Sequence, residues 1–175
     1  LSDITSCESG VPHAPCCVIE DAPAFPYRGF MLDSARHFLP SSYLRRFIDA
    51  MASLKLNRFH WHLSDDSGFR LPIATRPRLT EVGAFVDSDP QVRGYYSPQE
   101  VSDLVSFAAE RGVTVIPEID VPGAAFAAVT AYPQLCCTGT PVRNPGHQKD
   151  LLCAGSEATF QFLEEVIADV ASMFP

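Results

Sequence analysis

Ionisable side chains stand at the ends of three short apolar segments in this chain of 175 residues. They are Asp33, Arg36 and His37 in the first group, His60, His62, Asp65 and Asp66 in the second, and Glu118 and Asp120 in the third. Charged residues are rarely found beside buried strands unless they are paired or functional. Carboxylates and imidazoles can exchange protons with a substrate, and a guanidinium can hold its oxygens. The repeated pattern therefore predicts a functional site.

Several of these side chains also have a purely structural interpretation. His60 and His62 are two residues apart, so both point to one face of a strand, and either can be a core imidazole bonded to a backbone carbonyl. Glu118 can balance Arg28 or another buried cation. Asp33 can cap the turn that follows it. These interpretations explain single residues, whereas the pattern recurs at three segments.

Strands and helices that alternate along the chain would position these groups. We expect strands over residues 27–33, 57–63 and 113–120, and helices over about 41–56, 97–111 and 157–173. Trp61 alternates with the two histidines, so it should pack beneath the helices.

Local signals mark the ends of two of the expected helices. The segment Ser97-Pro98-Gln99-Glu100 is a capping box with proline at the first helical position, and Gly112 ends the helix that it opens. Ser41 or Ser42 can cap the free amides of the preceding helix.

The order of strand and helix indicates an α/β fold with a parallel sheet and right-handed crossovers. Functional residues in such sheets gather beyond the carboxyl ends of the strands, where the ionisable groups lie. Residues 64–96 and 121–155 form long connections, which are usually functional in a compact domain. We interpret residues 1–26 as an irregular N-terminal lead-in or the end of a preceding domain, and residues 27–175 as one domain.

Charge and hydropathy exclude several classes of partner. The net charge of -8 argues against nucleic acid or an anionic membrane surface, because both would repel the chain. No apolar run approaches the roughly 20 residues that a membrane helix needs. The first ten residues lack a basic and an apolar region, so we expect any signal peptide to have been removed or never present.

The six cysteines indicate the compartment. They are Cys7, Cys16, Cys17, Cys136, Cys137 and Cys153, without a CxxC pair, so a zinc site built on them is not expected. An even number in loop segments favours disulfides and an extracytoplasmic location, which would be secreted, periplasmic or lysosomal. Buried thiols in a cytosolic protein are the alternative. Cys137 and Cys153 bracket the second long connection and would form a bridge across it, with Cys136 as a competing partner.

Five blocks of the sequence together resemble the β-N-acetylhexosaminidases of glycoside hydrolase family 20. They are YRGFMLDSARHFLP, LKLNRFHWHLSDDSGFRL, RPRLTEVGAF, SPQEVSDLVSFAAERGVTVIPEIDVPG and LLCAGSEATFQFLEEVIADVASMFP. The resemblance covers about residues 26–175. It implies a partial TIM (β/α)8 barrel, namely the first three βα units after the lead-in.

The resemblance also implies an activity, the release of terminal β-linked N-acetylhexosamine from a glycan or chitooligosaccharide, without a cofactor. In this family the acetamido group of the sugar attacks the anomeric carbon, an exception to the usual two-carboxylate scheme. An Asp-Glu pair assists: the Asp orients the acetamido group and the Glu protonates the leaving oxygen.

Five residues match the family's motifs. Arg36 would hold the outer hydroxyls of the sugar with its planar fork of donors, and Asp66 would also bind substrate. Asp65 would lie near the acid Glu and raise its pKa through like charge. Asp120 would belong to the supporting polar network, and His62 would support it from behind.

Two departures from the family pattern stand out. The family has Asp-x-Pro-Gly-His after the third strand, whereas this chain has Ala124 in place of the histidine. No Asp-Glu dipeptide occurs in the chain, because its family position lies beyond Pro175. The chain is then a fragment that needs the C-terminal part of the barrel as its partner, an incomplete gene product, or a short relative.

Two other functions stay open at this point. A catalytically inactive sugar-binding relative would keep Arg36 and lose the acid. A metal-dependent TIM-barrel hydrolase would use His60, His62, Asp65 and Asp66 as ligands, but the His-x-His pattern is loose and the flanking blocks favour the glycosidases.

Overall fold

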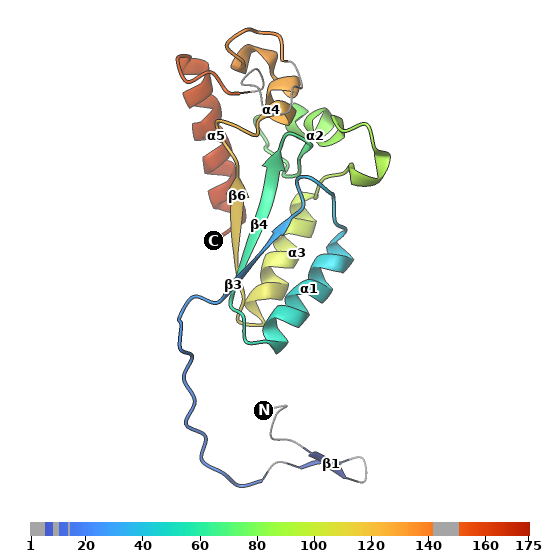
Figure 1. Ribbon diagram of the computed structural model, residues 1–175, viewed down its shortest axis with the longest axis vertical. Coiled ribbons are helices and arrows are strands. Elements are labelled where there is room, and N and C mark those ends of the chain that lie inside the picture. Colours follow the sequence, from blue (N-terminus) through green and yellow to red (C-terminus); the bar gives the residue numbers. More distant parts are fainter. Residues whose placement is uncertain (1–5, 9–10, 14, 142–150) are drawn as a thin grey trace.

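A four-stranded sheet is the centre of the computed structural model, which describes residues 6–8, 11–13, 15–141 and 151–175 (Figure 1). Its three parallel strands are β3 (Gly29–Asp33), β4 (Arg58–Asp65) and β6 (Thr114–Ile119), with β4 in the middle, and the short β5 (Gly68–Phe69) pairs antiparallel with the end of β4. Both pairings with β4 are parallel, which confirms the predicted topology.

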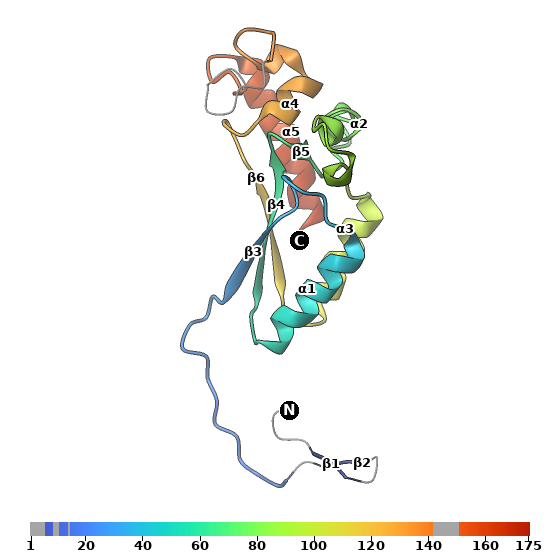
Figure 2. The ribbon, with the colours of Figure 1, turned by 45° about the vertical axis from the view of Figure 1, so that its right-hand side comes forward.

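Three long helices cover one side of this sheet (Figure 2). They are α1 (Ser41–Ser53), α3 (Pro98–Ala109) and α5 (Glu157–Met173). Phe59, Trp61 and Leu63 alternate along β4 toward the helices and are fully buried. The Trp61 ring contacts Phe174 at the end of α5 and Tyr96 before α3. Trp61 therefore packs beneath the helices, as its spacing predicts.

The helix ends follow their local signals in part. The capping box of Ser97 and Glu100 is present, and Gly112 adopts a φ of 70°, although α3 already ends at Ala109. The predicted serine cap of α1 is wrong, because Pro40 occupies the cap position without a side-chain hydrogen bond. Ser41 Oγ instead donates to Glu100 Oε1, which ties the start of α1 to the start of α3.

The two long connections contain short elements of their own. Between β4 and α3 lie β5 (Gly68–Phe69), α2 (Arg78–Glu81) and the 3₁₀ turns η1 (Gly83–Phe85) and η2 (Pro90–Val92). After β6 lie α4 (Phe126–Ala131) and η3 (Pro133–Leu135). Residues 142–150 of the second connection lie outside the described residues.

The N-terminal lead-in differs from the expectation of an irregular segment. It includes a small antiparallel hairpin of β1 (Ser6–Glu8) and β2 (Val11–His13). Residues 15–27 then run to β3 as an extended, exposed segment outside the sheet (Figures 1 and 2). Val18 is 91% exposed, so this segment buries little apolar surface in the described part of the chain.

The predicted bridge between Cys137 and Cys153 is present, which confirms this pairing over the one with Cys136. Cys136 is a buried thiol whose Sγ lies 3.3 Å from Thr138 Oγ1. The N–H of Cys153 donates to the carbonyl of Leu135, so the bridge and a backbone hydrogen bond hold the ends of the connection together.

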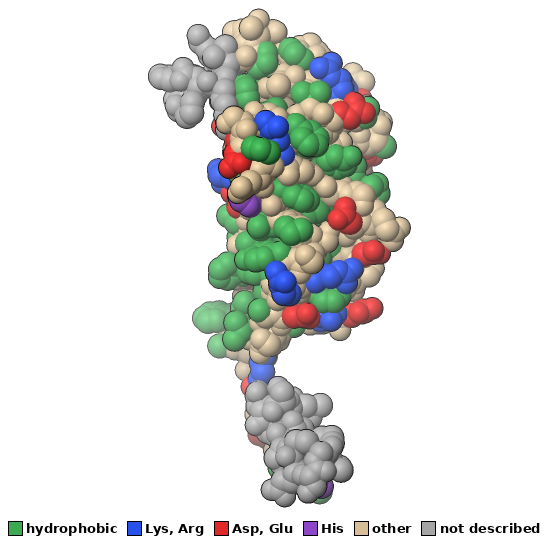
Figure 3. All heavy atoms as spheres, turned by 90° about the vertical axis from the view of Figure 1, so that its right-hand side faces the viewer, with side chains coloured by type: hydrophobic (Ala, Val, Ile, Leu, Met, Phe, Trp, Pro, Cys, Tyr) green, Lys and Arg blue, Asp and Glu red, His purple; other side chains and the backbone are tan. Residues whose placement is uncertain are grey.

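The face that carries α1 and α2 mixes side chains of both charges with apolar ones (Figure 3). Arg111, just after the end of α3, links this helix to α1, because it donates to Asp49 while its guanidinium lies 3.3 Å from the centre of the Phe107 ring. Among the described residues, none of the helices has the length and apolar character to cross a bilayer.

Candidate active site

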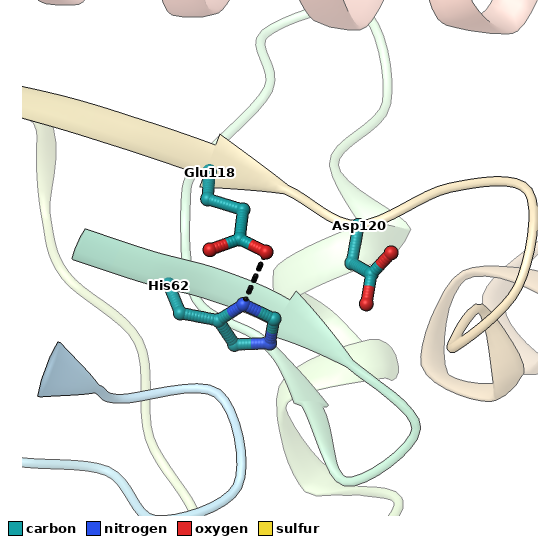
Figure 4. Close-up of side chains that lie close together, drawn as sticks. All are labelled: His62, Glu118 and Asp120. Atoms are coloured by element: carbon teal, nitrogen blue, oxygen red, sulfur yellow. Dashed lines mark ion pairs between the residues drawn. The ribbon is translucent and has the colours of Figure 1, made fainter. Parts of the chain in front are cut away.

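One row of side chains crosses the inner face of the sheet. Asp33, His62 and Glu118 are aligned in register on β3, β4 and β6. The His62 side chain is only 4% exposed and lies between two carboxylates. Its Nε2 is 3.1 Å from Asp65 Oδ2, and its Nδ1 is 3.0 Å from Glu118 Oε1 (Figure 4). The second contact is an ion pair that is not aligned for a hydrogen bond.

A bulge near the end of β4 explains why His62 and Asp65 meet. The register with β6 shifts between His62 and Ser64, so β4 has one residue more than its neighbour at this point. Such bulges change the direction of the side chains that follow. Strict alternation would place Asp65 on the helical side with Leu63, whereas its carboxylate contacts the ring of His62.

Arg36 lies at the carboxyl ends of the strands and is held by two carboxylates. Its guanidinium is 2.6 Å from Asp33 Oδ2 and 2.6 Å from Asp65 Oδ2, while 59% of its side-chain surface stays exposed. Asp33 Oδ1 accepts hydrogen bonds from the N–H groups of Ala35 and Arg36, which is the predicted cap of this turn. A ligand at this rim can therefore reach an exposed guanidinium whose position is fixed by two carboxylates.

The network fixes the charge of its members. The hydrogen bond with Asp65, helped by Glu118, raises the pKa of His62 to about 9 against the effect of burial. Burial alone would raise the pKa of Asp65, but hydrogen bonds from His62 and from the Asp66 N–H, with the charge of Arg36, hold it below its ordinary value. At neutral pH His62 is thus a cation and Asp65 an anion.

Of the two partners expected for Glu118, the structure has the buried cation other than Arg28. Arg28 does not balance it, because that guanidinium donates to the carbonyls of Lys55 and Phe25 outside the sheet. Glu118 instead lies between His60 and His62, at 2.5 Å and 3.0 Å. The two histidines therefore share one face of β4, as predicted, and Glu118 joins them.

Asp120 and Asp66 lie at the same rim as Arg36. Asp120 follows the end of β6, its N–H donates to Ser64 Oγ, and its charge contributes to the raised pKa of Arg36. Asp66 Oδ1 accepts from the N–H of Phe126 and so holds the start of α4. The predicted gathering of Arg36, Asp65 and Asp120 at one end of the sheet is confirmed. Substrate binding by Asp66 stays a prediction.

A metal could be considered at His62, Glu118 and Asp120, whose ligand atoms lie within 4.8 Å of one another (Figure 4). Metal ligation requires a deprotonated imidazole nitrogen. Both ring nitrogens of His62 already face carboxylates, Nε2 that of Asp65 and Nδ1 that of Glu118. The geometry favours a proton-linked network.

Two features of the site were missed by sequence reasoning. Ser64 holds the N–H of Asp120, and the bulge brings Asp65 to His62. The small, polar Ser64 inside an apolar strand was the available signal.

Ala124, where the family has histidine, adopts a left-handed φ of 48°, a conformation that costs an alanine about 1–2 kcal/mol.

The raised pKa of His62 predicts a pH-dependent stability. The value rises from 6.5 to about 9 on folding, so the contribution is complete below pH 6.5 and is lost as pH rises through 9. We expect the free energy of unfolding to fall by about 1–2 kcal/mol over this pH range. This is less than the full pKa shift would give, because solvent reaches Glu118. Urea unfolding of the chain between pH 6 and 9.5 measures it. In His62→Gln the same pH slope should be absent, and an unchanged slope would contradict the assignment.

Known proteins are similar to this chain over most of its length. Residues 25–175 match the family described as glycosyl hydrolase family 20, catalytic domain. A β-hexosaminidase of Porphyromonas gingivalis is 47% identical over 166 residues, which span 92% of this chain and 21% of the relative. A β-hexosaminidase of Vibrio furnissii is 42% identical over 94% of this chain and 29% of its own length.

Solved structures give the same result. The β-N-acetylhexosaminidase of Bacteroides fragilis superposes with a TM-score of 0.82 at 44% identity, over 87% of this chain and 30% of that one. The exo-β-N-acetylglucosaminidase of Vibrio harveyi, solved with N-acetylglucosamine, superposes with a TM-score of 0.87 at 37% identity. The match covers 99% of this chain and 30% of that one. The chain therefore spans about a fifth to a third of the length of these relatives. With its parallel strands, its rim of paired charges and these matches, the chain belongs to glycosyl hydrolase family 20 and forms part of its TIM-barrel catalytic domain.

Proposed function

We propose that this chain supplies the first part of the active site of a β-N-acetylhexosaminidase, which releases terminal β-linked N-acetylhexosamine from glycans or chitooligosaccharides. The observation that supports this most is the exposed guanidinium of Arg36, fixed between Asp33 and Asp65 at the carboxyl ends of the strands. A planar donor group with two carboxylate supports is suited to neighbouring sugar hydroxyls.

The supporting residues have separate tasks in this proposal. Asp65 is ionised and fixed, so it places a negative charge beside the position of a general acid and favours that acid's protonated form. His62 holds Asp65 from the inner face of the sheet, and Glu118 in turn holds His62. Asp120 adds a second negative charge at the rim.

The remaining part of the barrel is the partner that we assign to this chain. Its strands would cover the inner face, where Met31 is 46% exposed and the His60 side chain 38%. The family relatives, which are about three times as long as the matched part, supply the same chemistry in one chain. An extracytoplasmic location fits the disulfide of Cys137 and Cys153.

A chimera tests the proposed function directly. Residues 25–175 replace the matching segment in the Vibrio harveyi enzyme, and hydrolysis of a chromogenic β-N-acetylglucosaminide is measured. We expect turnover, and we expect Arg36→Lys to lower kcat/KM by about tenfold or more, because a charged hydrogen-bonding group is worth about 1.5–3 kcal/mol. Arg111→Lys, on the helical side, is the matched control and should leave kcat/KM unchanged.

An inactive chimera would argue for the second candidate, a sugar-binding protein without hydrolysis. Ala124 favours this candidate, because it cannot donate a hydrogen bond or relay charge where the family has histidine. Ala124→His in the inactive chimera should then restore turnover. Turnover without this change would reject the second candidate.

A further inference from the structure

We infer that Arg70 is a positioning residue, which fixes the Ser34–Arg36 turn and thereby places the guanidinium of Arg36. The side chain of Arg70 is fully buried and donates only to backbone carbonyl oxygens in the hydrogen bonds described. The acceptors are the carbonyls of Ser34, Ala35, Ser67, Ala84, Val92 and Gly94. One guanidinium thus joins the β3–α1 turn to the connection between β4 and α3.

The turn that carries Arg36 is held from both sides. Its N–H groups are satisfied by Asp33 and by the carbonyl of His62. Its buried carbonyls at Ser34 and Ala35 are satisfied by Arg70, at 3.0 Å and 2.7 Å. Without Arg70, two buried carbonyls would lose their donor, and such groups move toward water when they can.

Arg70 has a rigid base of its own. Its N–H donates to the carbonyl of Leu63 in β4, and its carbonyl accepts from the N–H of Tyr96. Its side chain passes across Gly68, where any side chain would overlap the guanidinium, so glycine is required at that position. Backbone and side chain are therefore both fixed relative to the sheet.

Arginine is the side chain that suits this place. Its guanidinium offers five N–H groups in a planar fork, whereas lysine offers three from a single nitrogen. Burial lowers the pKa of Arg70 to about 10, so it is still charged at neutral pH. A lysine has only three donors for the six carbonyls, so it would leave several of them without a partner.

Amide hydrogen exchange of the 175-residue chain tests this inference without any sugar. In Arg70→Ala, the N–H groups of Ala35 and Arg36 should exchange about ten- to a hundredfold faster, as expected for loss of a charged donor to a buried carbonyl, while α3 changes less. Millimolar guanidinium chloride, far below denaturing concentration, should restore slow exchange by occupying the vacated position. The pKa of the Asp65 carboxyl, measured by NMR titration, should rise in Arg70→Ala and return to its wild-type value when guanidinium is added.

Arg111→Ala is the matched control, because it removes an arginine from the helical side and should leave both readouts unchanged. Two results in folded Arg70→Ala would overturn the inference. One is an unchanged exchange rate of the N–H groups in the turn, and the other is a rise in that rate that is equally large in α3. If Arg70→Ala does not fold, Arg70→Lys decides: faster exchange confined to the turn supports the inference, and full protection rejects it. The inference rests on the proposed function only where it assumes that Arg36 binds sugar. An inactive chimera would reject that assumption, whereas the exchange experiment tests separately whether Arg70 positions the turn.

Discussion

The 175-residue chain by itself is expected not to hydrolyse a chromogenic β-N-acetylglucosaminide. It contains no Asp-Glu dipeptide, the pair to which the family resemblance assigns the catalysis. A general acid contributes roughly 10²- to 10⁴-fold, and correct positioning of the acetamido group about 7–11 kcal/mol of the barrier. Asp65 cannot replace the acid, because its pKa is lowered and it has no proton to donate at neutral pH.

Adding a second polypeptide with the remaining barrel units should produce turnover. The measurement is release of the chromophore by each polypeptide alone and by the mixture. Arg36→Lys in the mixture is the control, since it should reduce activity without preventing association. Robust turnover by the single chain, abolished by Asp65→Asn, would show that the acid lies within these residues.

Removal of the disulfide is expected to have the largest effect on stability. Cys137 and Cys153 are 16 residues apart, and a bridge that closes about 15 residues contributes about 3 kcal/mol in the chain-entropy model. The double variant Cys137→Ser, Cys153→Ser should therefore lower Tm by about 6–12 °C for a chain of this size. Thermal unfolding followed by circular dichroism measures this.

The exposed pair of Cys16 and Cys17 provides the control, because replacing both with serine should leave Tm unchanged. A reductant should lower the Tm of the wild-type chain but not that of the double variant at positions 137 and 153. Mass spectrometry that finds free thiols at both Cys137 and Cys153 under non-reducing conditions would contradict the prediction.

The sheet and its helices could be predicted because their signals are local. The apolar runs at β3, β4 and β6, the capping box at Ser97 and the turn at Gly112 each depend on a few neighbouring residues. Parallel order then follows from the alternation of strand and helix. The serine cap of α1 was wrong because the helix already begins at Ser41, which leaves Pro40 at the cap position, and the Ser41 hydroxyl donates to Glu100, 59 residues away.

The position of the candidate site could be predicted from the sequence, but the partners of its side chains could not. Residue type and strand position placed Arg36, Asp65 and Asp120 at one rim. The partners of Glu118 depend on the register between β4 and β6, and the direction of Asp65 depends on a bulge of one residue. Register and bulges arise from contacts between strands, which no short stretch of sequence specifies.

The two faces of β4 give its residues different surroundings. Phe59, Trp61 and Leu63 pack against the helices, whereas His60 and His62 pair with carboxylates on the inner face. In a library of single substitutions selected for folding, apolar replacements should therefore be tolerated better at positions 59, 61 and 63 than at position 62, where a buried imidazole lies between two carboxylates. Directed evolution of thermal tolerance can accordingly vary the apolar side chains at positions 59, 61 and 63 while the charged pairs of the inner face are kept.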